Sequence, residues 1–219
     1  AVRIFKARDE IFKILDMPEM SINEKLLVIL KYCASIQEYI NNDEYDALNE
    51  YVNTFGRSDI EHILMEMNDE SESDEFGDVD VWECIRSIMY PYEDMEVLNT
   101  RWEQILAEMT ETFHENMDNE QYQETKEEFM TAMLEREYEY RNFITYLVFR
   151  YFAKAVYDYD VVGKAKMFVT NYLILRQMDM LVWYRKHKRF TFEDRIDTVH
   201  IFSRQVEYSE DNMEALYES

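Results

Sequence analysis

The feature that most constrains the fold of this 219-residue chain is its shortage of glycine and proline. The sequence holds three glycines and two prolines, namely Gly56, Gly77, Gly163, Pro18 and Pro91. A β-rich fold of this length needs many tight turns, and these two residue types fill the turn positions with special backbone geometry. Long helices joined by few turns fit better, and the apolar fraction of 47% can supply their core. We therefore predict an all-α fold, an irregular helical bundle of about ten helices.

Local patterns predict where several of these helices begin and end. Ser21 with Glu24, and Ser58 with Glu61, have the Ser-x-x-Glu spacing of a capping box, so each pair is expected to open a helix. Thr191 is expected to cap a helix near the C-terminus. Each of the two prolines is expected to end the helix that precedes it, because proline lacks the N–H that continues a helix.

Two stretches near the C-terminus, residues 140–157 and 161–183, are apolar on almost all faces. Helices of this kind lie at the centre of a bundle. We therefore predict two central apolar helices, with Phe149 and Leu173 among their buried residues.

Acidic residues suggest a division of the chain. Residues 68–79 read NDESESDEFGDV, and their self-repulsion and low hydrophobicity predict a mobile acidic loop. This loop would separate N-terminal helices in residues 1–67 from a central and C-terminal bundle in residues 80–219. The two parts are expected to form one compact domain overall.

The net charge of −24 limits the partners that the chain can attract. Nucleic acids and anionic membranes would be repelled, whereas a basic or lysine-bearing protein would be attracted. A solvated surface that keeps the protein soluble explains the same charge more simply, and both interpretations stay open. No apolar run is long enough for a membrane span, because Arg150 and Arg176 interrupt the best candidates.

The cysteines and the first residues bear on location and completeness. Cys33 and Cys84 lie far apart in helical patterns and match neither a disulfide framework nor a metal site, so we expect reduced thiols and a cytoplasmic protein. The chain begins without Met and enters an amphipathic pattern at Val2 without an N-cap. We interpret it as a fragment of a longer protein whose oligomeric state the sequence leaves open.

Charged side chains within the apolar stretches are the candidate site that residue chemistry offers. Arg150, Arg176 and Asp179 lie in the two most apolar helices, where an unpaired charge would cost several kcal/mol. We predict that at least one of these arginines bonds to Asp179 or to Glu207. A buried structural network and a ligand pocket are both compatible with this pattern.

Other motifs carry less chemistry. The spacing of Glu111 with His114, and of Asp197 with His200, occurs in carboxylate-bridged di-iron helices, but such pairs arise readily by chance in so acidic a chain. We therefore predict no metal site. The basic run at residues 186–189 is expected at a helix C-terminus, where cations oppose the helix dipole.

The C-terminal third also resembles a known family. The stretches that carry the resemblance are Tyr140-Arg141-Asn142-Phe143, Phe149 through Val156, Tyr172 through Asp179, Phe192 through Arg195, and Ser203 through Asn212. Together they resemble the helical region that follows the cysteine-rich segment of the flagellin lysine-N-methylases. The resemblance adds Asn142 and Arg204 to the candidate polar network. Gln205 and Tyr208 depart from the family pattern, which has Glu and His at these positions.

The resemblance implies a function for the longer protein. Members of this family are linked to methyl transfer from S-adenosylmethionine to flagellin lysines, and their cysteine-rich segment is thought to hold an iron–sulfur or other metal cluster. None of those cysteines occurs in this chain, so we expect no cofactor in it and no activity from it alone. The alternative function is a non-catalytic helical module whose acidic face docks a basic protein.

Overall fold

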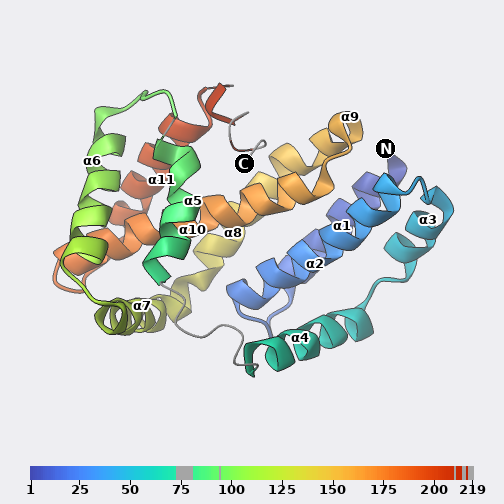
Figure 1. The fold of residues 1–219 in the computed structure, drawn as a ribbon, viewed down its shortest axis with the longest axis horizontal. Helices are drawn as coiled ribbons and strands as arrows, with labels where there is room; N and C mark the ends of the chain where they lie inside the picture. The colour runs from blue at the N-terminus through green and yellow to red at the C-terminus, as the bar shows by residue number, and fades with distance from the viewer. Residues whose placement is uncertain (73–80, 94, 210, 214–215, 217–219) are drawn as a thin grey trace. The chain divides into compact units, whose positions relative to one another are not determined.

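The computed structural model describes residues 1–72, 81–93, 95–209, 211–213 and 216 (Figure 1). All regular elements within these residues are helical, so the predicted all-α irregular bundle is confirmed. None of the described helices combines the length and the apolar character needed to cross a membrane. The helices form two compact units, one from residues 1–77 and 137–169 and the other from residues 78–136 and 170–219.

Unit 1 contains the N-terminal helices and the first part of α10. Its elements are α1 (Val2–Asp16), α2 (Ile22–Asn41), α3 (Tyr45–Thr54), α4 (Arg57–Glu72), α8 (Glu137–Tyr151), a 3₁₀ turn (Phe152–Lys154), α9 (Ala155–Asp158) and the start of α10 (Val161–Arg185). Helix α1 packs on α2, α3 and α8, and α2 also packs on α3 and α8. Their core is aliphatic at its centre, with Ile11, Val28 and Leu147 fully buried.

Unit 2 contains the helices that carry the candidate site. Its elements are α5 (Val81–Glu93), α6 (Thr100–Met109), a π-helical turn (Thr110–Glu115), α7 (Asn119–Met133), a 3₁₀ turn (Leu134–Arg136), the remainder of α10, and α11 (Phe192–Val206). Its core is more aromatic, with Trp102, Phe113, Phe129 and Phe202 buried. The indole of Trp102 and the ring of Phe202 meet edge to face at 6.3 Å between centroids.

This grouping differs from the predicted division of the chain. Helix α4 continues to Glu72, and residues 73–79 of the predicted acidic loop lie outside the described residues. Residues 137–169 belong with the N-terminal helices because α8 packs on α1 and α2. The carboxylate of Glu137 also accepts a bond from the backbone N–H of Ile22 at 3.0 Å, which satisfies a donor at the start of α2.

The predicted helix starts are mostly confirmed. Ser21 and Glu24 form the predicted capping box of α2, and Thr191 caps α11. The predicted box at Ser58 is wrong, because α4 already begins at Arg57. There the carboxylate of Asp59 accepts the backbone N–H of Gly56 at 2.8 Å, so a different pair closes the first turn.

The predicted break at Pro91 is also wrong. Helix α5 includes this proline and ends two residues later, at Glu93. Pro91 has no N–H to bond to the carbonyl four residues back, and the helix ends within one turn of it.

The predicted burial of Phe149 is wrong, since 68% of this residue is exposed. Helix α8 buries one face, to which Ile144, Leu147 and Val148 belong, and presents Tyr146 and Phe149, three residues apart, on the other. Phe149 is therefore an aromatic residue on an exposed helix face and not part of the core. Leu173 of α10 is half-buried, whereas its neighbours from Ile174 to Leu181 are buried.

Candidate functional site

The candidate site is built around the connection between α10 and α11 in unit 2, residues 186–191, which we call the α10–α11 turn. His187 and Lys188 in this turn have positive φ angles of 54° and 64°, a left-handed conformation that is uncommon for residues other than glycine. The backbone N–H groups of His187 and Lys188 bond to the carbonyls of Tyr184 and Trp183, at 3.1 and 2.8 Å. This pair of bonds is the Schellman ending of a helix, with His187 where glycine is usual.

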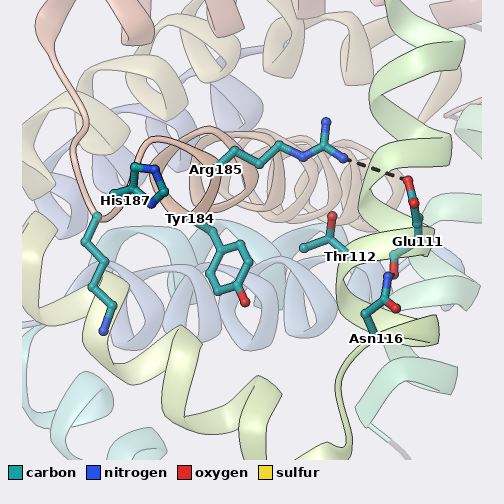
Figure 2. Close-up of a pocket in the computed structure, with 7 residues that line it drawn as sticks. Glu111, Thr112, Asn116, Tyr184, Arg185 and His187 are labelled. Atoms are coloured by element: carbon teal, nitrogen blue, oxygen red, sulfur yellow. Dashed lines mark hydrogen bonds and ion pairs between the residues drawn. The ribbon is translucent and has the colours of Figure 1, made fainter.

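A groove of about 710 Å³ lies on one side of the turn, beside the π-helical turn that follows α6. It is lined by Glu111, Thr112, Asn116, Tyr184, Arg185, His187 and Lys188. Figure 2 shows Arg185 reaching toward Glu111, and their charged atoms are 3.9 Å apart. Arg185 also pairs with Glu108 at 2.6 Å, so its charge is shared between two carboxylates. Single π-helical turns occur frequently at functional sites.

A second groove, of about 790 Å³, lies between α7 and the turn, and we call it the acid-lined groove. Its lining residues are Glu124, Glu127, Glu128, Thr131, Ala132, Trp183 and Lys188. The ammonium of Lys188 lies 2.5 Å from a carboxylate oxygen of Glu128 and 5.8 Å from the centroid of the Trp183 ring. Lys188 therefore belongs to both grooves.

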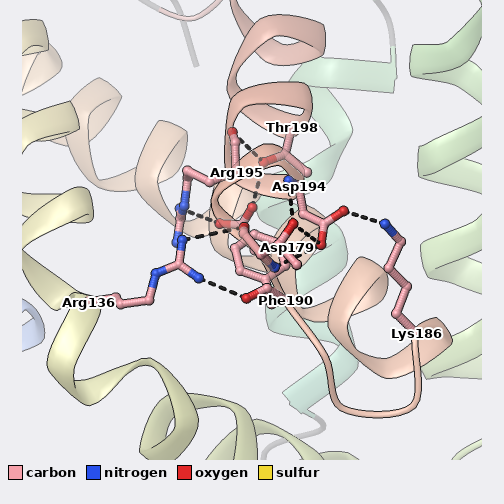
Figure 3. Close-up of polar contacts among 8 residues, drawn as sticks. Arg136, Asp179, Lys186, Phe190, Asp194, Arg195 and Thr198 are labelled. Atoms are coloured by element: carbon pink, nitrogen blue, oxygen red, sulfur yellow. Dashed lines mark hydrogen bonds and ion pairs between the residues drawn. The ribbon is translucent and has the colours of Figure 1, made fainter.

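Polar contacts hold the turn in its unusual conformation (Figure 3). Arg136 donates to the carbonyl of Phe190 at 2.9 Å, and the ammonium of Lys186 binds the carboxylate of Asp194. The same carboxylate accepts the backbone N–H of Thr191 at 2.8 Å and so completes the capping box of α11. These contacts offset the backbone cost of left-handed residues, about 1–3 kcal/mol each.

A buried ion pair joins the two helices that the turn connects. Asp179 of α10 is fully buried, and its carboxylate accepts bonds from Arg195 at 2.5 Å and from Thr198 at 2.6 Å, both on α11. Arg195 is itself 5% exposed. Because a buried carboxylate needs such donors, this contact fixes α11 against α10 and sets the geometry of the turn.

The pKa of Asp194 reflects its place at the turn. Burial of this carboxyl would raise its pKa, but the bonds from Lys186 and Thr191 together outweigh burial and lower the pKa below its ordinary value. Asp194 therefore stays ionised at neutral pH and keeps both contacts.

The six side chains named from the sequence fall in different places. Asn142 lies exposed on α8, where it lines a surface groove of unit 1 with Phe12 and Phe149. Arg150 is exposed, and its Nε donates to the hydroxyl of Tyr151 at 2.9 Å.

The other four belong to unit 2. Arg176 is buried with its guanidinium 5.3 Å from the Tyr172 ring centroid, and Asp179 binds Arg195 as described. Arg204 is exposed, and half-buried Glu207 accepts a bond from Ser203 at 3.1 Å. None of the six is among the described residues that line the two grooves beside the turn.

The sequence did not single out Arg195, the π-helical turn or the acid-lined groove. The sequence did contain a signal for Arg195, because this residue directly follows the capping box of α11, at the position that faces α10. The other two depend on backbone conformation and on packing between segments distant in sequence, which motif spacing does not report.

The closing segment of the resemblance has a structural role in this chain. Gln205 is fully buried, accepts the backbone N–H of Leu98 at 3.0 Å and donates to the carbonyl of Glu96 at 2.7 Å. Asn212 binds the same loop, accepting the N–H of Glu96 at 2.9 Å and donating to its carbonyl at 3.0 Å. An amide at position 205 supplies both the donor and the acceptor, which an ionised Glu cannot do.

The described residues do not fit the metal cluster that the resemblance implies for the longer protein. Cys33 is buried, and burial raises the pKa of its thiol, which opposes formation of the thiolate that a cluster binds. Cys84 is exposed on another helix. Among the described residues, no three His, Cys, Asp or Glu side chains come together as metal ligands would.

Comparison with known proteins places the chain in a family. No curated protein and no solved structure matches it. A family profile, described as the FliB lysine N-methylase C-terminal domain, matches residues 8–219 and so nearly the whole chain. The match includes the π-helical turn, the α10–α11 turn and both grooves. The chain belongs to the FliB lysine N-methylase C-terminal domain family.

Proposed function

We propose that this chain is the helical C-terminal portion of a protein that transfers methyl groups from S-adenosylmethionine to lysine side chains of flagellin. The observation that carries this proposal is the family match over residues 8–219. We assign the cluster to a cysteine-rich part of the longer protein, because the cysteines of this chain do not suit one. S-adenosylmethionine supplies an electrophilic methyl group, and the lysine that receives it must react as the neutral amine.

We assign recognition of the protein substrate to the helices described here. The net charge of −24 favours approach of a lysine-bearing surface. The acidic side chains of α7 lie beside the α10–α11 turn, where their carboxylates line a groove. A cytoplasmic location forms part of the proposal and agrees with the buried free thiol of Cys33.

The test is a methylation assay with the full-length protein. It uses purified flagellin, isotope-labelled S-adenosylmethionine and anaerobic conditions with the cluster reconstituted, and the label is then mapped by peptide mass spectrometry. We expect label on lysine side chains. The 219-residue chain alone serves as the comparison and should incorporate none. Absence of label with the full-length protein, or label confined to other residue types, contradicts the proposal.

The alternative is a non-catalytic module whose acidic surface docks a basic protein, and the charge of the chain favours it as a second candidate. Binding of flagellin without methyl transfer would support this alternative. Such binding should weaken as salt is added, because the Debye length falls from about 10 Å at 0.1 M to about 3 Å at 1 M.

A further inference from the structure

Lys188 shows how a lysine side chain fits the acid-lined groove. Its ammonium lies against the carboxylate of Glu128 and over the face of the Trp183 indole, the two kinds of partner that a lysine finds most favourable. The Trp183 ring is held in place by an edge-to-face contact with Phe129 at 5.6 Å. The aromatic wall of the groove therefore contacts a cation from this same chain.

The groove has more negative charge than Lys188 neutralises. Glu124, Glu127 and Glu128 lie at spacings of three and four residues and so share one face of α7. The nearest cation along that helix, Lys126, contacts Gln123, and its charge also interacts with that of Glu127. With Lys188 paired to Glu128 and Lys126 acting on Glu127, the groove keeps an excess of negative charge, which a lysine side chain that took the place of Lys188 would also meet.

The ion pair that holds Lys188 in the groove is weak enough for another lysine to replace Lys188. Its side chain is 57% exposed and that of Glu128 is 54% exposed, so their ion pair is a surface pair that contributes little to stability. A substrate lysine presented by a folded protein brings further contacts and can displace it.

We propose that the acid-lined groove docks a lysine side chain of the protein substrate, and that Lys188 occupies the groove until that lysine displaces it. The identity of the substrate rests on the proposed function, whereas the cation preference of the groove rests on its own geometry. Lys188 thus acts as an internal competitor for the site.

The groove serves recognition and not the reaction itself. Carboxylates stabilise the ammonium form of a lysine, whereas a methyl acceptor must lose its proton to expose the nitrogen lone pair. The docked lysine is therefore a neighbour of the methylated one on the substrate surface.

The test measures peptide binding to the 219-residue chain without a methyl donor. The probe is a synthetic peptide with three Gly-Ser-Lys repeats. Its binding is measured by calorimetry and by the change in the NMR signal of the Trp183 indole N–H. Lys188→Ala should bind the peptide about threefold more tightly, and Glu128→Gln about threefold more weakly, as expected for one surface charge pair. Lys188→Gln keeps a long side chain without the charge and should behave like Lys188→Ala.

Two controls match these variants in charge. Arg189→Ala removes a cation from the same turn outside the groove, and Glu103→Gln removes an exposed acid on α6. Arg189→Ala should change the affinity much less than Lys188→Ala does, and Glu103→Gln much less than Glu128→Gln does. In both controls the Trp183 signal should still respond to the peptide as in the wild type. Equal effects of Lys188→Ala and Arg189→Ala, or of Glu128→Gln and Glu103→Gln, would overturn the proposal, because they would show bulk attraction only. Groove binding without methyl transfer by the full-length protein would instead contradict the proposed function alone.

Discussion

Replacing Arg195 by Met should destabilise unit 2 by about 3–5 kcal/mol, the cost of breaking a buried ion pair by removing one partner. Asp179 is fully buried, and the hydroxyl of Thr198 would still donate to it from α11. Met matches the length of the aliphatic part of Arg, so most of the loss comes from the broken ion pair with Asp179.

Urea unfolding at pH 7, followed by tryptophan fluorescence, measures this effect. The three tryptophans, Trp82, Trp102 and Trp183, all fall within the residue ranges of unit 2, so the signal reports that unit. The double variant Asp179→Leu/Arg195→Met should cost at least about 1 kcal/mol less than the sum of its single changes, because it strands no charge. Arg189→Met, an exposed control, should cost less than about 0.5 kcal/mol. A cost below about 1 kcal/mol for Arg195→Met would refute the claim that this pair holds the turn.

Three further predictions concern other parts of the fold. Phe152→Ala should cost about 3–5 kcal/mol and Phe149→Ala less than about 0.5 kcal/mol in thermal unfolding, because Phe152 is fully buried and Phe149 is exposed; equal costs would contradict the assigned burial of these two side chains. Gln205→Glu should cost about 2–3 kcal/mol at pH 7, because the ionised side chain cannot donate to Glu96, and less at pH 4, where a protonated Glu regains a donor; a cost independent of pH would argue against this account. Burial opposes ionisation of Asp194, but its bonds with Lys186 and Thr191 lower its pKa below the ordinary value, so the ionised form stabilises the fold and this contribution is lost as the pH falls through the lowered pKa. The stability difference between the wild type and Asp194→Asn, measured by urea unfolding, should therefore shrink from pH 5 to pH 3, and a constant difference would exclude the ionised cap.

Local features of the sequence predicted the local features of the fold. The spacing of Ser21 with Glu24 predicted the start of α2, because a capping box involves only neighbouring residues. The shortage of glycine and proline predicted the all-α class, because a β-rich fold needs more of these residues in its turns. The exposure of Phe149 could not be read from its surroundings, because apolar neighbours on both sides of a helix do not reveal which face packs.

The candidate site depends on contacts between segments far apart in the chain. Asp179 was identified as a buried charge, yet its partner Arg195 lies 16 residues away across the α10–α11 turn. The contact of Lys188 with Glu128 spans 60 residues and needs both the left-handed turn and the packing of α7. The run of basic residues at 186–189 did not indicate that Lys186 binds Asp194 while Lys188 binds Glu128.

Docking of a lysine of the protein substrate in the acid-lined groove, next to the lysine that receives the methyl group, is the central proposal. It is tested most directly by the initial rate of flagellin methylation as a function of flagellin concentration, for the full-length protein and its Glu128→Gln variant. Our account predicts a KM raised about threefold with kcat unchanged, since the groove contributes binding in the ground state and transition state alike. A lower kcat at constant KM, or the same change in Glu103→Gln, would contradict it.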